Sequence, residues 1–315
     1  MRTVLHKSKQ YWLVALKVLL LGSTFAYIYY KITSGETLKW NLFISEIQSK
    51  NFAYILAFIL LAGINWFLEI AKWQTVVSKI KIISFSEATK QCLMALTVSL
   101  PTPNRIGDYG AKAFFYPSEK RKKILLLNFL SNSAQMIITC FLGGIGLCFL
   151  GLNYSLPISS VNLSILISVL LIVVVATYFF RKKQLIIKGL SIVNLFKYIK
   201  KLSYALKSKL LLYSLLRYIV FSFLFYVILL FFNAEISILQ AIPLIFAMYL
   251  LVSILPSFFV FDVVVRGGVA VWLFSLANVN ELTILCTVFT MWLLNFILPA
   301  FVGSFFVARY KTANL

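Results

Sequence analysis

The sequence has 315 residues, of which 61% are hydrophobic and 12% charged, with a net charge of +21. Its mean hydropathy of +0.93 excludes an ordinary soluble domain and places the chain among membrane proteins. The Lys and Arg residues cluster between apolar runs, which indicates basic loops at anionic lipid headgroups and excludes a nucleic acid partner. The single histidine, His6, excludes metal centres and acid–base enzymes that depend on several histidines.

Six apolar runs predict an all-α, polytopic membrane protein, because each is near or above the ~20 residues that cross a hydrocarbon core. We expect an uncleaved first span, although the first run also has the small-residue pattern of a signal peptide. The six predicted spans cover about 12–32, 52–77, 124–151, 160–180, 210–232 and 283–308.

Two further apolar stretches, Glu87–Tyr116 and Ala241–Ala277, are interrupted by proline and charged residues. Their arms of about 13–15 residues are short for a full span, which favours two re-entrant helical hairpins. If neither hairpin crosses the membrane, every strongly basic loop falls on one side, and the positive-inside rule then predicts that both termini are cytoplasmic.

This arrangement divides a single membrane domain (1–315) into two halves, about 12–151 and 160–308, with opposite orientations. Such an inverted repeat is common in transporters. The hairpins also share a spacing of proline, acid and cation, given by Pro101, Asp108 and Lys112 in the first and by Pro256, Asp262 and Arg266 in the second. Between the halves, residues 184–207 have the apolar stripe of an amphipathic helix in the membrane interface, with a solvated loop as the alternative.

Ionisable residues at membrane depth are costly and therefore mark candidate sites. We predict a polar pocket at the bilayer midplane where the hairpin tips meet, in which cations neutralise a phosphate and acids orient the cations or meet an amine. The candidate substrate-binding residues are Glu69, Asn104, Arg105, Asp108, Lys112, Asp262 and Arg266.

A purely structural role is the alternative for these residues. Asp108 with Lys112, and Asp262 with Arg266, have the i, i+4 spacing of ion pairs on one helix face. Glu69 has Lys72 and Trp73 close by in sequence. We expect three amide side chains of one span to form interhelical hydrogen bonds, and a glycine-rich stretch of the same span to allow close helix packing; these are Asn128, Asn132, Gln135 and residues 143–146.

The segment Pro103–Lys112, with its proline, arginine, glycine and acid, resembles a motif of the lysylphosphatidylglycerol synthase transmembrane region, also called the flippase-like domain. The acid is Asp108 where that family more often has Glu, and Phe259–Gly268 lacks the family's glycine-rich stretch before a Glu. The resemblance covers most of the chain and implies a bacterial cytoplasmic membrane protein. We expect a stand-alone member without the family's soluble aminoacyl transferase.

The resemblance favours a lipid flippase or scramblase for a charged phospholipid, an aminolipid or a polyprenyl-linked lipid. We expect no enzymatic activity, no cofactor and no metal. The expected partners are anionic lipid headgroups and enzymes of lipid or glycan synthesis. The alternatives are an integral membrane enzyme of lipid or glycan-carrier synthesis, and a scaffold subunit that does not transport. No nucleotide-binding motif occurs in the sequence, so ATP would have to be used by a partner.

Overall fold

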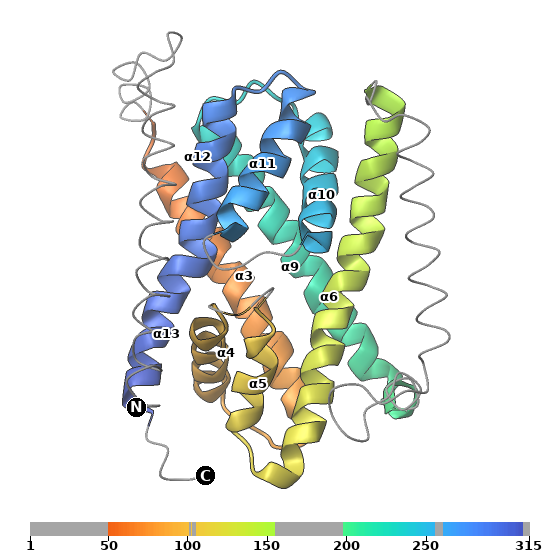
Figure 1. Cartoon of the computed structure of the whole chain (residues 1–315), viewed down its shortest axis with the longest axis vertical. Helices are drawn as coiled ribbons and strands as arrows, with labels where there is room; N and C mark the ends of the chain where they lie inside the picture. Colours follow the sequence, from red (N-terminus) through yellow and green to blue (C-terminus); the bar gives the residue numbers. More distant parts are fainter. Residues whose placement is uncertain (1–49, 101, 103–104, 155–197, 256–260, 311–315) are drawn as a thin grey trace, which may run out of the picture.

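The computed structural model describes residues 50–100, 102, 105–154, 198–255 and 261–310, and its secondary structure there is entirely helical (Figure 1). The helices are α3 (Ala53–Val77), α4 (Phe85–Ser99), α5 (Gly107–Phe114), α6 (Ser118–Asn153), α9 (Tyr204–Phe231), α10 (Ile238–Ile254), α11 (Phe261–Ser275), α12 (Glu281–Trp292), the π-helical turn η2 (Leu293–Ile297) and α13 (Leu298–Arg309).

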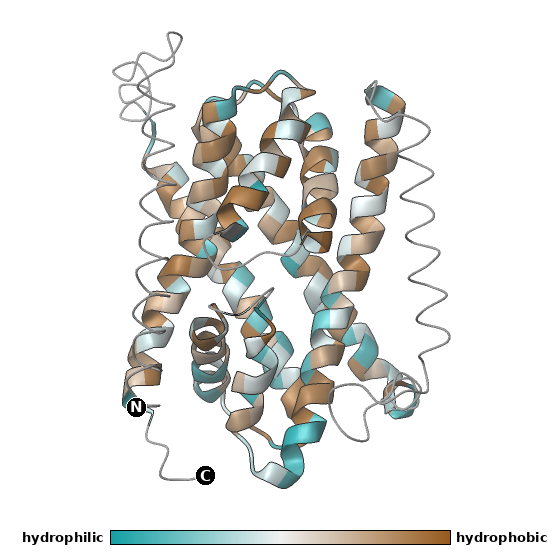
Figure 2. Cartoon of the chain, viewed as in Figure 1, coloured by the Kyte–Doolittle hydropathy of each residue, from teal (hydrophilic) through white to brown (hydrophobic). Residues whose placement is uncertain are grey.

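Four helical rods run the full height of the bundle: α3, α6, α9 and the continuous α12–η2–α13. They have 25, 36, 28 and 29 residues and are apolar enough to cross a membrane, as predicted for the second, third, fifth and sixth runs. Only 22–44% of the most apolar stretch of each rod is buried inside the protein. Most of this apolar surface therefore faces outward, as expected where lipid is the solvent. Figure 2 shows that hydrophobic residues predominate along the rods. The predicted spans 12–32 and 160–180 lie outside the described residues.

Side-chain caps fix where several helices begin. Ser84 accepts a hydrogen bond from the Glu87 backbone N–H at the start of α4, and Ser203 accepts one from Leu206 at the start of α9. The cap at Ser203 starts α9, so residues 204–207 of the predicted interfacial segment belong to α9. Residues 198–201 are helical before this cap, and the earlier part of that predicted helix lies outside the described residues.

Two helix pairs fill the space between the rods. The pair α4–α5 opens toward the lower end of the bundle and the pair α10–α11 toward the upper end, so that their tips face each other near mid-height (Figure 1). These four helices have 15, 8, 17 and 15 residues. Each is shorter than the ~20 residues of a full span.

The helix contacts fall into matching pairs. Helix α10 packs along α6, and α4 packs along α13; α5 contacts α6, and α11 contacts α12; α3 and α9 pack against each other. The α10–α11 pair therefore packs on the rod α6, and the α4–α5 pair packs on the rod that ends in α13.

Glycines bring the backbones together at these crossings. A Cβ at Gly146 would lie 2.5 Å from the Pro243 carbonyl oxygen of α10, and one at Gly143 would overlap Leu250. On the other side of the bundle, a Cβ at Gly303 would overlap the backbone of Leu93 in α4. The glycine-rich stretch of α6 thus permits close helix packing, as predicted.

We expect Gly146→Val to destabilise the protein by about 1–3 kcal/mol or more, because the added atoms meet backbone that cannot move aside. Gly144→Val is the matched control, since a Cβ at Gly144 has nothing within 4 Å. Melting temperatures measured in detergent should fall for the first variant only. Equal melting temperatures for the two variants would contradict the close α6–α10 contact.

Candidate functional site

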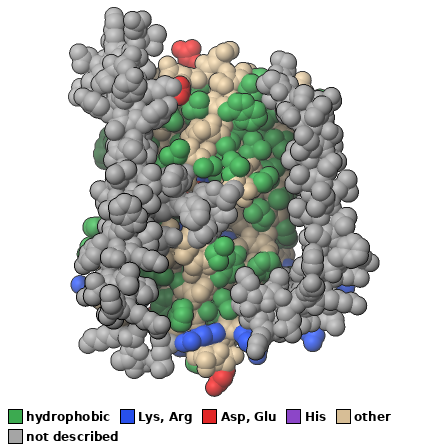
Figure 3. All heavy atoms as spheres, viewed as in Figure 1, with side chains coloured by type: hydrophobic (Ala, Val, Ile, Leu, Met, Phe, Trp, Pro, Cys, Tyr) green, Lys and Arg blue, Asp and Glu red, His purple; other side chains and the backbone are tan. Residues whose placement is uncertain are grey.

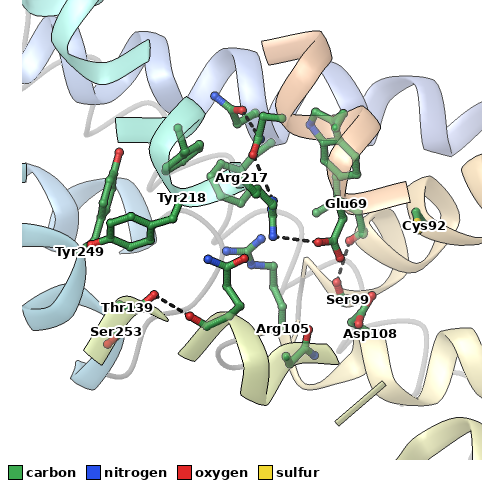
Figure 4. A pocket seen from close by; sticks show the side chains of 18 of the residues that line it. Glu69, Cys92, Ser99, Arg105, Asp108, Thr139, Arg217, Tyr218, Tyr249 and Ser253 are labelled. Carbon is green, nitrogen blue, oxygen red and sulfur yellow. Dashed lines mark hydrogen bonds and ion pairs between the residues drawn. The ribbon is translucent and has the colours of Figure 1, made fainter. Parts of the chain in front are cut away.

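A cavity of about 400 Å³ lies where the tip of α4–α5 faces α10–α11 (Figure 4). Both hairpins and all four rods contribute to its wall. A second cavity of about 340 Å³ adjoins it on the side of α11. The two cavities share five lining residues, which are Arg105, Tyr249, Ser253, Arg266 and Phe296.

Each of the four rods has a polar side chain at or within one residue of its midpoint, and all four line the first cavity. Three of them are hydrogen-bonded in a chain: the Arg217 Nε–H donates to Asn65 Oδ1 at 3.1 Å, and Asn65 Nδ2 donates to Asn295 Oδ1 at 2.8 Å. The fourth is Gln135 of α6. Each rod has a long apolar stretch, and this layer places polar groups at its middle, where interhelical hydrogen bonds can satisfy them.

Glu69 of α3 contacts cations from three different helices. Its Oε2 lies 2.9 Å from Nη1 of Arg217 on α9 and 3.0 Å from Nζ of Lys72 on α3. Its Oε1 lies 4.0 Å from Nζ of Lys112 on α5. The Lys72 side chain is buried, so Glu69 supplies the charge that makes this burial tolerable.

Lys112 joins this cluster to the first hairpin. Its Nζ lies 3.3 Å from Oδ1 of Asp108 and donates to Oδ1 of Asn128 at 3.4 Å. Asn128 Nδ2 in turn donates to Oδ2 of Asp108 at 2.8 Å. The predicted i, i+4 pair and the predicted interhelical hydrogen bond of Asn128 are therefore both present, and together they fix α5 against α6.

The tip of the first hairpin has a tight local structure. The Thr102 hydroxyl donates to the Ser99 carbonyl at 2.6 Å and accepts from the Gly107 N–H at 2.9 Å. A Cβ at residue 107 would lie 2.9 Å from Thr102 Cγ2, so any larger residue here would force the Thr102 side chain to shift. Arg105 has a φ of 56°, a left-handed conformation that is unusual for a non-glycine residue and that tends to occur at functional sites.

Arg105 of the first hairpin and Arg266 of the second both lie over the ring of Phe296, which belongs to η2. The Arg105 guanidinium carbon lies 4.3 Å from the ring centroid, and that of Arg266 lies 5.5 Å from it. Asp262 Oδ2 accepts from Arg266 Nε at 2.8 Å, which is the predicted i, i+4 pair. Two cations, one from each hairpin, thus approach one aromatic ring where the two cavities join.

The π-helical turn η2 places Phe296 at this point. Pro299 has no backbone N–H, so it cannot donate to the Asn295 carbonyl as an α-helix requires. The chain widens by one residue per turn over Leu293–Ile297, and such insertions often occur at functional sites. As a result, Asn295 and Phe296 both line the first cavity.

The structure brings together most of the residues that the sequence predicted. Glu69, Arg105, Asp108, Lys112 and Arg266 line the first cavity, and Asp262 lines the second together with Arg105 and Arg266. Asn104 lies outside the described residues. Of the other predicted amide side chains, Asn132 and Gln135 line the cavity, and Gln135 also donates to the Ser214 carbonyl at 3.4 Å.

Sequence reasoning missed Arg217, Asn295 and Phe296. Arg217 is an ionisable residue in the middle of an apolar run, which is itself a sufficient signal. Asn295 lies four residues before Pro299 within a span, and this combination indicates a freed carbonyl. Nothing in the sequence identifies Phe296 among 29 phenylalanines.

The site has an excess of positive charge. The described residues of the two cavities and their ion pairs include five cations and three carboxylates; these are Lys72, Arg105, Lys112, Arg217 and Arg266 against Glu69, Asp108 and Asp262. Within the described part of the chain, no group of three or more His, Cys, Asp or Glu side chains is placed to hold a metal ion. The arrangement is suited to binding an anion.

Comparison with known proteins gives one family. The model of the family described as "Lysylphosphatidylglycerol synthase TM region" matches residues 13–307. A search of curated proteins found no match.

We expect Glu69→Gln to destabilise the protein by about 3–5 kcal/mol, because it leaves the buried Lys72 without its nearest acid. Adding Lys72→Met should recover part of this loss, since the uncompensated charge is then removed. The free energies of unfolding of the two single variants and the double variant give the coupling. Glu235→Gln, at an exposed position, is the control. A double variant no more stable than Glu69→Gln alone would contradict the assigned pair.

Proposed function

The chain belongs to the lysylphosphatidylglycerol synthase TM region family, and from this premise we propose that it moves a charged lipid between the leaflets of the membrane. It is a multi-pass membrane protein, and its proposed activity is transport without a covalent step. The observation that carries the proposal is the charged cavity at mid-height, to which both hairpins and all four rods contribute.

We propose that α4–α5 and α10–α11 are re-entrant hairpins. Basic residues of the described part gather at the end where α4–α5 opens, in the segments 79–81, 120–123, 200–209 and at Arg309 (Figure 3). The opposite end has Lys50, Glu235 and Glu281. By the positive-inside rule, the basic end faces the cytoplasm. Hairpin one then enters from the cytoplasmic side and hairpin two from the outer side.

The corresponding helix contacts support an inverted repeat. If α3, α4, α5 and α6 are matched to α9, α10, α11 and α12–α13, the contact of α6 with α10 corresponds to that of α13 with α4, and the contact of α5 with α6 corresponds to that of α11 with α12. Repeats of this kind allow alternating access, because either half can adopt the packing of the other around a fixed central site.

The cavity offers a lipid headgroup the polar contacts that the hydrocarbon core cannot provide. The four cations and two carboxylates that line the cavity replace water around a charged group, and the insertion cost of a charge at the bilayer centre is ~2.5–3.5 kcal/mol on translocon scales. A volume of about 400 Å³ is within the range of small-molecule sites and accommodates a headgroup. The acyl chains would remain in the lipid beside the apolar outer faces of the rods.

The proposal is tested with purified protein in proteoliposomes that contain trace amounts of fluorescent phospholipids of different headgroup charge. We expect the wild-type protein to expose inner-leaflet label to a membrane-impermeant quencher faster than protein-free vesicles do. Arg266→Gln should slow this exposure at least about tenfold, as expected for the loss of a charged hydrogen-bonding group, and Asp108→Asn should also slow it.

Arg309→Gln is the matched control, since Arg309 is exposed at the end of α13 and far along the rod from the cavity. Circular dichroism and gel filtration of each variant separate lost activity from lost folding. If the wild-type protein moves none of the lipids, and Asp108→Asn behaves identically, the transport proposal is wrong.

A further inference from the structure

We propose that the cavity recognises the phosphate group of a lipid with a net negative headgroup, with Arg105 and Arg266 as its two principal contacts, and that it selects against aminoacylated, net cationic lipids. This inference rests on the proposed function and names the substrate class of the same site. Transport alone leaves a charged phospholipid, an aminolipid and a polyprenyl-linked lipid equally open.

The carboxylates of the site already have cations. Glu69 contacts Lys72 and Arg217, Asp108 contacts Lys112, and Asp262 contacts Arg266. Asp108 additionally accepts a hydrogen bond from Asn128. A ligand amine would therefore have to displace a protein cation from each carboxylate that it approached, and that cation would remain behind in a buried site.

Arg105, unlike these carboxylates, has no oppositely charged group in direct contact among the described residues. Among the described residues its guanidinium forms no ion pair or hydrogen bond, and its one direct partner is the ring of Phe296 at 4.3 Å. Stacking on a ring face leaves the N–H groups at the edge of the guanidinium plane available for an anion. The Asp262 and Asp108 carboxylates act on Arg105 electrostatically, but each is already bonded to a cation of its own helix.

Arg266 completes the anion site. Its Nε is bonded to Asp262 at 2.8 Å, and no described residue forms an ion pair or hydrogen bond with its two Nη groups. Because both guanidiniums are within 5.5 Å of the centre of the same ring, an anion beside Phe296 can be contacted by both. Two planar guanidiniums are suited to the several oxygens of a phosphate.

Unpaired polar atoms point to the same ligand. Trp66 Nε1, Gln135 Oε1 and the Tyr249 hydroxyl are buried without a hydrogen-bond partner among the described residues, and all three residues line the first cavity. Tyr249 is 9% exposed and also lines the second cavity beside Arg266. Buried polar groups normally have partners. The Trp66 Nε1–H and the Tyr249 hydroxyl can donate to a phosphate, and Gln135 Oε1 can accept from a hydroxyl group of the headgroup.

The test measures equilibrium binding to the full chain in a neutral detergent at constant ionic strength. The probes are dioctanoyl phosphatidylglycerol (net negative), dioctanoyl phosphatidylcholine (zwitterionic), dioctanoyl lysyl-phosphatidylglycerol (net positive) and glycerol 3-phosphate (a soluble phosphate). We expect phosphatidylglycerol to bind at least about tenfold more tightly than the other three, which corresponds to ~1.4 kcal/mol.

The variants Arg105→Gln and Phe296→Leu should each reduce phosphatidylglycerol binding, the first by about tenfold or more and the second by less, because Phe296 positions the guanidiniums rather than contacting the ligand. Arg105→Lys should recover only part of the affinity, since an ammonium cannot stack and bond in the same way. Arg309→Gln and Phe305→Leu, at exposed positions of α13, are the matched controls.

Binding separates this inference from the proposed function. Transport that favours lysyl-phosphatidylglycerol, together with tighter binding of that lipid, would overturn the inference and leave transport standing. Selective binding of phosphatidylglycerol without transport of any lipid would support the inference and contradict the proposed transport. Equal binding of glycerol 3-phosphate and phosphatidylglycerol would contradict a lipid as the source of the phosphate, and an unaltered affinity in Arg105→Gln would contradict the assigned contact.

Discussion

The rest of the structure depends on how the buried charge at Glu69 is compensated. This carboxylate lies within 3.0 Å of cations on α3 and α9 and 4.0 Å from Lys112 on α5. An ion in a low-dielectric interior is tolerated only when its partners are held close, so the contact fixes α3, α9 and the first hairpin relative to one another. Two of these cations, Lys112 and Arg217, also line the first cavity, and the five cations of the site have only three carboxylates to share.

The two hairpins add polar groups to this charge cluster and complete the site. Each one brings a short helix, an acid and a cation to mid-height without a full span of apolar residues, and glycines in α6 and α13 let α10 and α4 lie close enough to close the wall. Irregular backbone at membrane depth is stable only where protein surrounds it or water fills a cavity. The left-handed Arg105 and the π-helical turn at Leu293–Ile297 both lie at this cavity, where the Arg105 backbone N–H donates to the Thr102 carbonyl and the Asn295 side chain accepts from Asn65.

The sequence was most informative where residues interact with near neighbours. Proline and charged residues predicted the short, interrupted helices α4–α5 and α10–α11, and the i, i+4 spacing predicted the pairs of Asp108 with Lys112 and of Asp262 with Arg266. The partners of Glu69 were predicted only in part: Lys72 is three residues away, whereas Arg217 is 148 residues away and its proximity depends on how α3 packs against α9. Phe296 could not be predicted at all, since its role arises from a widened helical turn and from two arginines on other helices.

We propose that two hairpins enter this bundle from opposite sides and meet at one charged cavity. Single cysteines placed at Ser84 and Ser118, which flank hairpin one, and at Ser237 and Asn278, which flank hairpin two, test it in a cysteine-free background. A membrane-impermeant thiol reagent added to oriented vesicles should label the first pair from one side only and the second pair from the other side only. Labelling of Ser84→Cys and Ser118→Cys from opposite sides would mean that hairpin one crosses the membrane, which would contradict the account.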